Sequence, residues 1–306
     1  MILRKIIIDF MCLFFVGMAV LLFFFFGQPY KRGFFCNDES LYHPFHSSTV
    51  TSPMLYVIGL LLPICTMMVG EYIHAKYYSP VPTKMLFGYD IPTWLWAAYD
   101  KVGIFGFGAA TTVLITDVAK YTIGRLRPHF MSVCVPNINC TLIQNHHRYI
   151  EDYVCTGSLS TKLLKEVRLS FPSGHSSFSA YTMVYLALYL QSRLTWKGSK
   201  LLKHFLQLIC ILMAWFTALS RVSDYKHHWS DVLAGATLGT IVALVVFTIN
   251  GTGRSRESRA TPEGLMEEKH RATDYETTEG TQNELTSLRM GTVSYNGIER
   301  NSENID

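Results

Sequence analysis

The feature that most constrains this chain is a series of long apolar segments that contain no charged residue. A helix needs about 20 predominantly apolar residues to cross a bilayer. Six segments approach that length: residues 10–30, 52–70, 102–116, 176–192, 205–220 and 232–250. The third is short, but it can lengthen towards Trp94 or towards Lys120. We therefore predict an all-α polytopic membrane protein in which six transmembrane helices form a bundle.

The composition favours the same class of protein. Of the 306 residues, 49% are hydrophobic and 16% are charged, whereas soluble domains carry about 25% charged residues. The net charge of +4 is modest, so we expect no nucleic-acid partner. The first apolar segment is longer than the roughly 7–15 residues of a signal-peptide core. We interpret it as an anchor that is not cleaved.

The basic residues predict the orientation of the six helices. They cluster in three regions that fall on one side of the membrane: Arg4 and Lys5 before the first helix, Arg193, Lys197, Lys200 and Lys203 between the fourth and fifth, and Arg254, Arg256 and Arg259 after the sixth. Cytoplasmic loops carry an excess of Lys and Arg. Residues 27–51, 117–175 and 220–231 are therefore expected on the exoplasmic side. We expect the chain in the plasma membrane; whether a share lies in internal membranes stays open.

The polar C-terminal region differs from the rest of the chain. Residues 251–306 are rich in Glu, Thr, Ser, Arg, Asn and Gly and show no apolar periodicity. Such a segment buries too little apolar surface to offset the entropy lost on ordering. We predict a transmembrane domain over residues 1–250, followed by a disordered cytosolic tail over residues 251–306.

Two features of the exoplasmic loops are typical of that compartment. Asn139 begins an Asn-Cys-Thr acceptor for N-linked glycosylation. Four cysteines also fall in these loops, where disulfides are permitted: Cys36, Cys134, Cys140 and Cys155. The sequence does not determine how they pair, and four free thiols remain an alternative.

Three short segments next to apolar runs carry most of the chemical information. They are Lys120-Tyr-Thr-Ile-Gly-Arg-Leu-Arg127-Pro128, Pro172-Ser173-Gly174-His175 and Ser220-Arg221-Val-Ser-Asp-Tyr-Lys-His227-His-Trp-Ser-Asp231. All three are expected at the exoplasmic interface, where a lipid headgroup lies. Cations can neutralise phosphoryl oxygens, one histidine can attack, another can protonate the leaving oxygen, and a carboxylate can orient the attacking ring. This set can cleave a phosphate monoester without a metal or another cofactor.

The spacing within the segments refines this hypothesis. Lys120 and Arg127 are seven residues apart, so both face one pocket if the segment is helical. His227 and Asp231 are four apart, which places a carboxylate near an imidazole on one helical face. Taken singly, such residues are more often interfacial anchors or helix caps. The combination of three segments on one side favours a catalytic site.

The three segments match the motifs K-x6-RP, PSGH and SR-x5-H-x3-D, and the chain thereby resembles the type-2 phosphatidic acid phosphatase superfamily. No motif position departs from the pattern. Three wider segments are similar to the animal lipid phosphate phosphatases: Arg32-Gly-Phe-Phe-Cys-Asn-Asp-Glu-Ser40, Gly124-Arg-Leu-Arg-Pro-His-Phe130 and the stretch from Ser220 to Gly235. The resemblance covers roughly residues 1–250.

The resemblance implies a membrane enzyme that dephosphorylates phosphatidate, lysophosphatidate, sphingosine 1-phosphate and ceramide 1-phosphate at the exoplasmic face. Its implied partners are these lipids and the bilayer; whether the chain forms a homo-oligomer stays open. His227 is implied to form a phosphohistidine, Asp231 to hold its ring, and His175 to protonate the leaving alkoxide and then activate water. The implied phosphate-binding residues are Lys120, Arg127, Ser173, Gly174 and Arg221.

Four residues beside the motifs are left out of this set because they match no motif position: Arg125, Asp224, Lys226 and His228. Three rival hypotheses fit parts of the sequence. A metal-dependent phosphatase could use Asp224, His227, His228 and Asp231 as ligands, but adjacent histidines on a helix point apart. A transporter usually places ionisable groups near the bilayer midplane, where these six segments have none. A non-catalytic relative acting through protein contacts could dispense with the motif histidines, which this chain retains.

Overall fold

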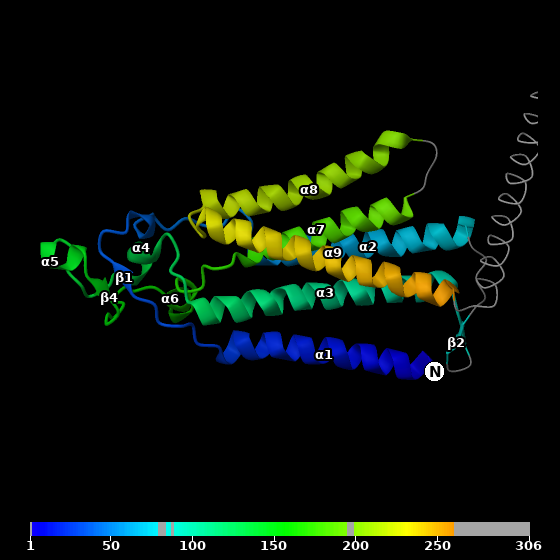
Figure 1. Cartoon of the computed structure of the whole chain (residues 1–306), viewed down its shortest axis with the longest axis horizontal. Coiled ribbons are helices and arrows are strands. Elements are labelled where there is room, and N and C mark those ends of the chain that lie inside the picture. Colours follow the sequence, from blue (N-terminus) through cyan, green and yellow to red (C-terminus); the bar gives the residue numbers. More distant parts are fainter. Residues whose placement is uncertain (1, 79–83, 87–88, 195–198, 260–306) are drawn as a thin grey trace, which may run out of the picture. The chain divides into compact units, whose positions relative to one another are not determined.

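Six long helices run side by side in the structure, a computed structural model that describes residues 2–78, 84–86, 89–194 and 199–259 (Figure 1). These helices are α1 (Ile2–Phe26), α2 (Ser52–Tyr78), α3 (Thr93–Ile123), α7 (Gly174–Arg193), α8 (Lys200–Ser223) and α9 (Trp229–Arg259). Each contains the greater part of one predicted apolar segment. The predicted helical bundle is thus confirmed, and the third helix lengthens at both ends, as the flanking residues allowed.

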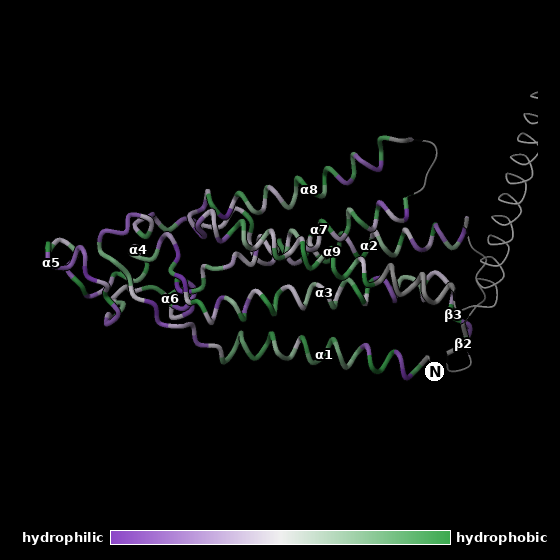
Figure 2. Tube along the Cα trace, viewed as in Figure 1, coloured by the Kyte–Doolittle hydropathy of each residue, from purple (hydrophilic) through white to green (hydrophobic). Residues whose placement is uncertain are grey.

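Five of the six helices are long and apolar enough to cross a membrane, namely α1, α2, α3, α8 and α9. The exception is α7, which was predicted as the fourth span. It lies within the bundle and buries Ser176, Ser177 and Thr182 together with its apolar residues. A helix that packs against other helices can carry polar side chains, because neighbouring protein groups satisfy them. Figure 2 shows hydrophobic residues over most of α1 and hydrophilic residues gathered around α6 (Thr161–Glu166).

Two glycines let α9 approach α7 closely. A Cβ atom at Gly235 would collide with the Ser173 carbonyl oxygen, and one at Gly239 would collide with that of Ser177. Small residues four apart allow helix backbones to come close together. The approach matters for the site, because it lets the Ser173 N–H donate to the Asp231 carbonyl oxygen at 2.9 Å.

The chain divides into two units, Met1–Thr248 and Ile249–Asp306, close to the predicted boundary at residue 250. Helix α9 continues to Arg259, so the predicted start of the tail at residue 251 lies within a helix. The remainder of the predicted tail, residues 260–306, lies outside the described residues, and its disorder stays a prediction.

Short elements gather at the end of the bundle where α3 ends and α7 begins (Figure 1). They are β1 (Phe34–Phe35), the 3-10 helix η1 (Glu39–Leu41), α4 (Phe130–Cys134), α5 (Ile143–His146), β4 (Tyr149–Ile150) and α6 (Thr161–Glu166). Strands β1 and β4 are antiparallel, with Phe34 opposite Ile150. Phe34, Phe130 and Val133 belong to a buried apolar cluster among these short elements, separate from the apolar core of the helical bundle. A separate antiparallel hairpin joins β2 (Lys84–Leu86) and β3 (Tyr89–Ile91).

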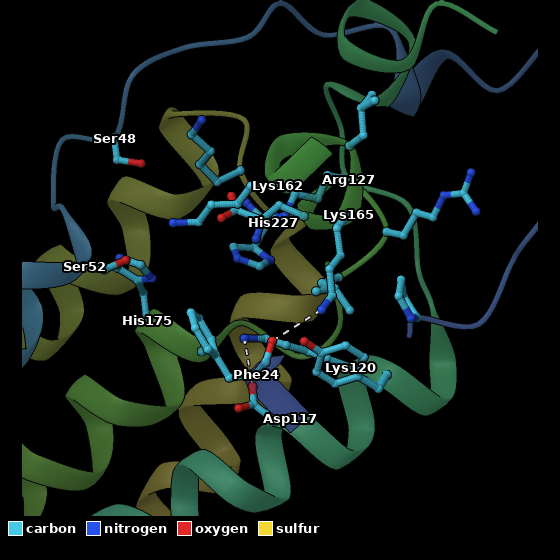
Figure 3. A pocket seen from close by; sticks show the side chains of 18 of the residues that line it. Phe24, Ser48, Ser52, Asp117, Lys120, Arg127, Lys162, Lys165, His175 and His227 are labelled. Carbon is cyan, nitrogen blue, oxygen red and sulfur yellow. Dashed lines mark hydrogen bonds and ion pairs between the residues drawn. The ribbon is translucent and has the colours of Figure 1, made fainter. Parts of the chain in front are cut away.

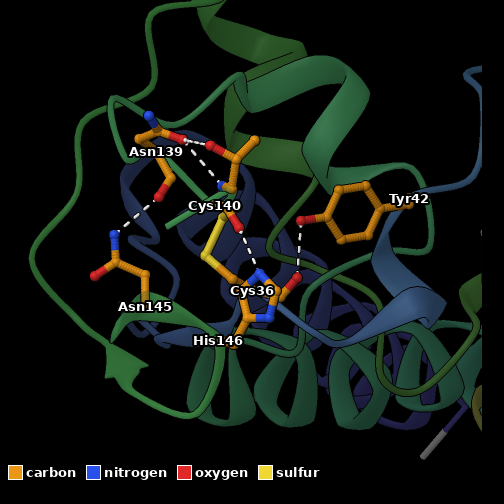
Figure 4. Close-up of a disulfide and its surroundings, with 7 residues drawn as sticks. Cys36, Tyr42, Asn139, Cys140, Asn145 and His146 are labelled. Carbon is orange, nitrogen blue, oxygen red and sulfur yellow. Dashed lines mark hydrogen bonds between the residues drawn. A yellow bond between two sulfur atoms is a disulfide. The ribbon is translucent and has the colours of Figure 1, made fainter. Parts of the chain in front are cut away.

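The four loop cysteines form two disulfides, Cys36–Cys140 and Cys134–Cys155. The sequence had left this pairing open. Figure 4 shows the first bond and its surroundings, where the Tyr42 hydroxyl donates to the Cys36 carbonyl oxygen at 2.9 Å. The bond joins the segment that follows α1 to the loop between α4 and α5. Asn139 is exposed beside it, and its side-chain oxygen accepts hydrogen bonds from the Thr141 backbone and hydroxyl.

Candidate active site

The three motif segments meet at a pocket of about 910 Å³ at this end of the bundle (Figure 3). Six of the eight residues predicted to act on phosphate line it: Lys120, Arg127, Gly174, His175, Arg221 and His227. The other two, Ser173 and Asp231, are fully buried and lie outside the lining. Residues from α3, α7 and the α8–α9 connection are thus brought together from distant parts of the chain.

His227 lies between α8 and α9 with its ring fixed by a backbone group. Its Nδ1 atom is 2.7 Å from the carbonyl oxygen of Ser170. A carbonyl only accepts hydrogen bonds, so Nδ1 carries the proton and Nε2 keeps its lone pair. Burial, together with the charges of Arg127 and Lys120, holds the pKa of His227 well below its ordinary value. The ring is therefore neutral and able to attack at physiological pH.

The relation between His227 and Asp231 differs from the predicted one. Helix α9 begins at Trp229, so His227 precedes the helix instead of sharing a face of it. The closest approach, between Nδ1 and Oδ2, is 3.9 Å, which is too long for a hydrogen bond. Ser170 bridges the two residues, because its hydroxyl donates to Asp231 Oδ2 at 2.6 Å.

Asp231 is the centre of a buried network that includes two residues left out of the predicted set. Arg125 forms an ion pair with its Oδ1 atom, and the backbone N–H of His228 donates to Oδ2 at 3.1 Å. The His228 ring lies 3.2 Å from the same oxygen through Nδ1. A fully buried carboxylate needs such partners, since an unpaired buried charge is costly. The network holds the start of α9 next to residues 125 and 170.

Arg221 is fully buried, and its guanidinium is fixed by two partners. One nitrogen donates to the Val50 carbonyl oxygen at 3.1 Å, and another pairs with Asp224 at 2.6 Å. Asp224 in turn accepts hydrogen bonds from the backbone and hydroxyl of Thr49, both at 2.8 Å. The Nε atom of Arg221 has no partner among the described residues. Asp224, also left out of the predicted set, thus orients a cation at the pocket wall.

Lys120 and Arg127 reach the pocket by a different route from the predicted one. Helix α3 ends at Ile123, and Gly124 adopts the left-handed conformation with a φ of 59°. The condition of a continuous helix over residues 120–127 is therefore not met, because the chain turns at Gly124. The Arg127 N–H donates to the Val167 carbonyl oxygen at 2.8 Å, and its buried Nε atom has no partner among the described residues. That unsatisfied donor suits an anion.

The start of α7 contributes the second motif. Ser173 caps the helix, and its hydroxyl oxygen accepts from the backbone N–H and the hydroxyl of Ser176. A Cβ atom at Gly174 would lie 2.8 Å from the Lys120 amino group, so glycine leaves room for that cation. The His175 ring lines the pocket, and its buried Nε2 atom has no partner within the described part of the chain. The nitrogen is available to a substrate.

The pocket holds further cations that motif matching did not identify. Lys226, directly before His227, places its amino group 3.7 Å from the centre of the Phe45 ring. Burial, with the charges of Arg127 and Arg221, lowers the pKa of Lys226 to about 8. Helix α6 and the residues after it add Lys162, Lys165 and Arg168. These residues are a basic cluster beside the second motif, a signal that the sequence contained.

Within the part of the chain that the structure describes, no group of three or more His, Cys, Asp and Glu side chains is arranged to hold a metal ion. The residues weighed as metal ligands have other partners. Asp224 pairs with Arg221, and Asp231 pairs with Arg125. The arrangement instead directs cationic donors and two imidazoles at one cavity, which suits a phosphorylated substrate.

In a comparison with known protein families, the sequence profile of the PAP2 superfamily matches residues 101–254. The chain belongs to the PAP2 superfamily. The matched region contains all three motifs, so the resemblance inferred from them is confirmed. Membership places this PAP2 chain among the phosphoric monoester hydrolases.

Two relatives match this PAP2 chain over most of its length. A Drosophila melanogaster protein, provisionally named a phosphatidate phosphatase, is 53% identical over 257 residues, which are 80% of this chain and 68% of that protein. Phospholipid phosphatase 1 of Rattus norvegicus is 40% identical over 246 residues, 79% of this chain and 83% of the rat protein. A crystal structure of a transmembrane PAP2-type phosphatidylglycerolphosphate phosphatase from Bacillus subtilis covers 65% of this chain and 74% of its own, with 23% identity and a TM-score of 0.38.

Proposed function

We propose that this protein removes phosphate from membrane lipid phosphates through a phosphohistidine on His227, without a metal. The substrates are phosphatidate, lysophosphatidate, sphingosine 1-phosphate and ceramide 1-phosphate. The observation that carries the proposal is the geometry of His227. Its ring is neutral, its Nδ1 proton is engaged by Ser170, and the residue lines a pocket rich in cations. The names of the relatives support lipid phosphates as the substrate class.

The first chemical step forms the covalent intermediate. His227 Nε2 attacks phosphorus as the bond to the lipid oxygen breaks. Burial and the charges of Arg221 and Lys120 lower the pKa of His175 to about 3, so His175 takes its proton from the bound phosphate monoanion and passes it to the lipid oxygen. The lipid alcohol leaves. Lys120, Arg127 and Arg221 neutralise the phosphoryl oxygens, whose charge is spread over the transition state. Gly174 provides the space that Lys120 occupies, and Ser173 holds the start of α7 in place.

The second step regenerates the enzyme. His175, now neutral, takes a proton from water, whose oxygen attacks phosphorus while the bond to His227 Nε2 breaks. Inorganic phosphate leaves, and the His227 ring returns to its neutral form with Nδ1 still held by Ser170. General acid–base catalysis of this kind typically contributes about 10²–10⁴-fold.

An exoplasmic active site in the plasma membrane is part of the proposal. The pocket opens at the end of the bundle that carries both disulfides, and disulfides persist in oxidising compartments. Basic residues predicted to be cytoplasmic lie at the opposite ends of the helices, among them Arg4 in α1, Arg193 in α7 and Lys203 in α8. Apolar lining residues such as Phe24 and Leu55 extend the pocket along α1 and α2, where lipid tails can remain in the bilayer.

The test uses purified protein in detergent and a substrate with radiolabelled phosphate. Rapid quenching should trap labelled protein that loses its label in acid and keeps it in alkali, as a phosphohistidine does. Released phosphate should follow with matching kinetics. His227→Ala should show neither label nor turnover, while His147→Ala, an exposed histidine in the loop before β4, should behave like the wild type. Turnover without a labelled intermediate would contradict the covalent route.

A further inference from the structure

The cation-rich pocket is also lined by a carboxylate that pairs with one of its cations. Asp117 lies on α3, one helical turn before Lys120. The lining contains seven lysine and arginine residues, and Asp117 and Glu166 are its only acidic residues within the described part of the chain. A carboxylate repels the phosphate that these cations attract. Its presence in the wall therefore indicates that a different part of the substrate lies beside it.

The ion pair with Lys120 leaves most of the Asp117 carboxylate unused. The Lys120 amino group is 3.5 Å from Asp117 Oδ1, longer than the roughly 2.7–2.9 Å of strong charge-assisted hydrogen bonds. The Asp117 side chain is 20% exposed and belongs to the pocket lining. An ionised carboxylate can accept about four hydrogen bonds. The geometry therefore leaves acceptor capacity facing the cavity.

Asp117 lies where the first carbons of a bound lipid would pass. Figure 3 shows Asp117 on the far side of Lys120 from Arg127 and Lys162. With the phosphate among the cations, the chain of the lipid runs past Asp117 towards the apolar lining of α1 and α2. The Lys120 amino group is 3.5 Å from Asp117 Oδ1, so the first two carbons of an alcohol whose phosphate binds Lys120 can reach the carboxylate.

We propose that Asp117 recognises a hydrogen-bond donor on that second carbon, and above all an ammonium group, as in sphingosine 1-phosphate. An ammonium group would form a short ion pair with the Asp117 carboxylate, using the acceptor capacity that Lys120 leaves free. An acylated amine, as in ceramide 1-phosphate, carries no charge and adds bulk at this point. The inference rests on the proposed function and assigns Asp117 a role in selecting among its substrates, separate from the phosphoryl-binding cations.

The experiment compares sphingosine 1-phosphate with ceramide 1-phosphate, which share a backbone and differ in acylation of the amine. The value of kcat/KM is measured for each lipid in mixed detergent micelles, with wild type, Asp117→Asn, Asp117→Glu and Glu166→Gln. In Asp117→Asn, the kcat/KM for sphingosine 1-phosphate divided by that for ceramide 1-phosphate should fall about tenfold. Asp117→Glu, which keeps the charge, should retain most of the preference. Glu166→Gln removes the other carboxylate of the lining and should leave the ratio unchanged.

The outcomes separate recognition from a merely structural role. If Asp117 served only to position Lys120, both lipids would lose activity in parallel, and an unchanged ratio would overturn the inference. An equal change in Glu166→Gln would also overturn it, because overall pocket charge would then explain the preference. Activity on ceramide 1-phosphate reports folding of each variant, and Asp117→Ala, which also removes the charge, supplies the ratio if Asp117→Asn does not fold. If the wild type hydrolysed neither lipid, the proposed function would fail together with the inference.

Discussion

The Nδ1 atom of His227 lies 2.7 Å from the carbonyl oxygen of Ser170, so a backbone group, and not a side chain, fixes the tautomer of the proposed nucleophile. The Ser170 hydroxyl contacts Asp231 at 2.6 Å. One residue thus couples the imidazole to the buried carboxylate. Hydrogen bonds of this kind set which ring nitrogen is free. The backbone at Ser170, just before the second motif, thus sets the direction in which the Nε2 lone pair of His227 points.

The first prediction separates these two contacts of Ser170. Ser170→Ala keeps the carbonyl that holds His227 but removes the hydroxyl bond to Asp231. We expect kcat to fall about tenfold with little change in KM, since one hydrogen bond to a charged group is lost. His227→Ala should lose at least about 10³-fold. Steady-state kinetics on a lipid phosphate provide the measurement; equal losses in the two variants would contradict the partial role.

The second prediction concerns alkaline pH and Lys226, whose pKa is lowered to about 8. Below pH 8 its amine is charged and attracts phosphate; as the pH rises through 8 that charge is lost. We expect kcat/KM to fall about tenfold between pH 7 and pH 9.5. Lys226→Arg should remove this alkaline limb because arginine stays charged. A limb that persists in Lys226→Arg would assign the titration to another group.

The third prediction uses the acid side of the profile. Burial and the neighbouring cations lower the pKa of His227 well below 6.5. Protonation inactivates the nucleophile, so the loss of activity with falling pH should come well below pH 6.5. Single-turnover formation of the phosphoenzyme, measured from pH 4 to pH 7, checks this. A midpoint near 6.5 would show that the ring is less shielded than its contacts indicate.

The fourth prediction concerns the stability of the Asp231 network. Arg125→Met leaves a fully buried carboxylate without its charged partner, although Ser170 and His228 still donate to it. The Arg125 side chain is 32% exposed, so screening reduces the loss to about 1–2 kcal/mol. The midpoint temperature of thermal unfolding in detergent should fall, and turnover should fall with it. Arg148→Met, at an exposed arginine in the loop before β4, is the matched control and should leave both unchanged.

The sequence could predict the helices and the eight motif residues, because apolar length and motif spacing are local properties. It could not predict the path of the chain between them. Lys120 and Arg127 share a pocket although the helix between them stops at Gly124, where a left-handed residue turns the chain. The polarity of α7 could not indicate its central place, because burial against other helices is a tertiary effect.

The partners of the motif residues were harder still to foresee. Ser170 acts through its backbone carbonyl, which any residue possesses, so no residue type marks that contact. Arg125 and Asp224 are visible in the sequence, but their roles depend on contacts with Asp231 and Arg221 that only the fold creates. The pairing of the four loop cysteines likewise depends on which loops lie together.

The fifth prediction tests the disulfide between Cys36 and Cys140, which joins segments 104 residues apart in the sequence. The double variant Cys36→Ser/Cys140→Ser should unfold more easily by about 2–5 kcal/mol, because the loop between the two positions becomes less constrained in the unfolded chain. Peptide mapping without reductant should recover the linked peptides from the wild type. Cys12→Ser, at a free and exposed cysteine of α1, should have no such effect.

The last prediction joins the orientation of the helices to the proposed function. Asn139 is exposed at the end of the bundle that carries the pocket, so a glycan there would show that this end faces the exoplasmic side. We expect glycosidase to shift the wild type on a gel and to leave Asn139→Gln unchanged. Intact cells should then hydrolyse a membrane-impermeant lipid phosphate analogue added to the medium, and His227→Ala at equal surface level should not. Hydrolysis that appears only after permeabilisation would place the pocket on the cytosolic side, because the analogue reaches His227 and Lys120 only from the face to which they open.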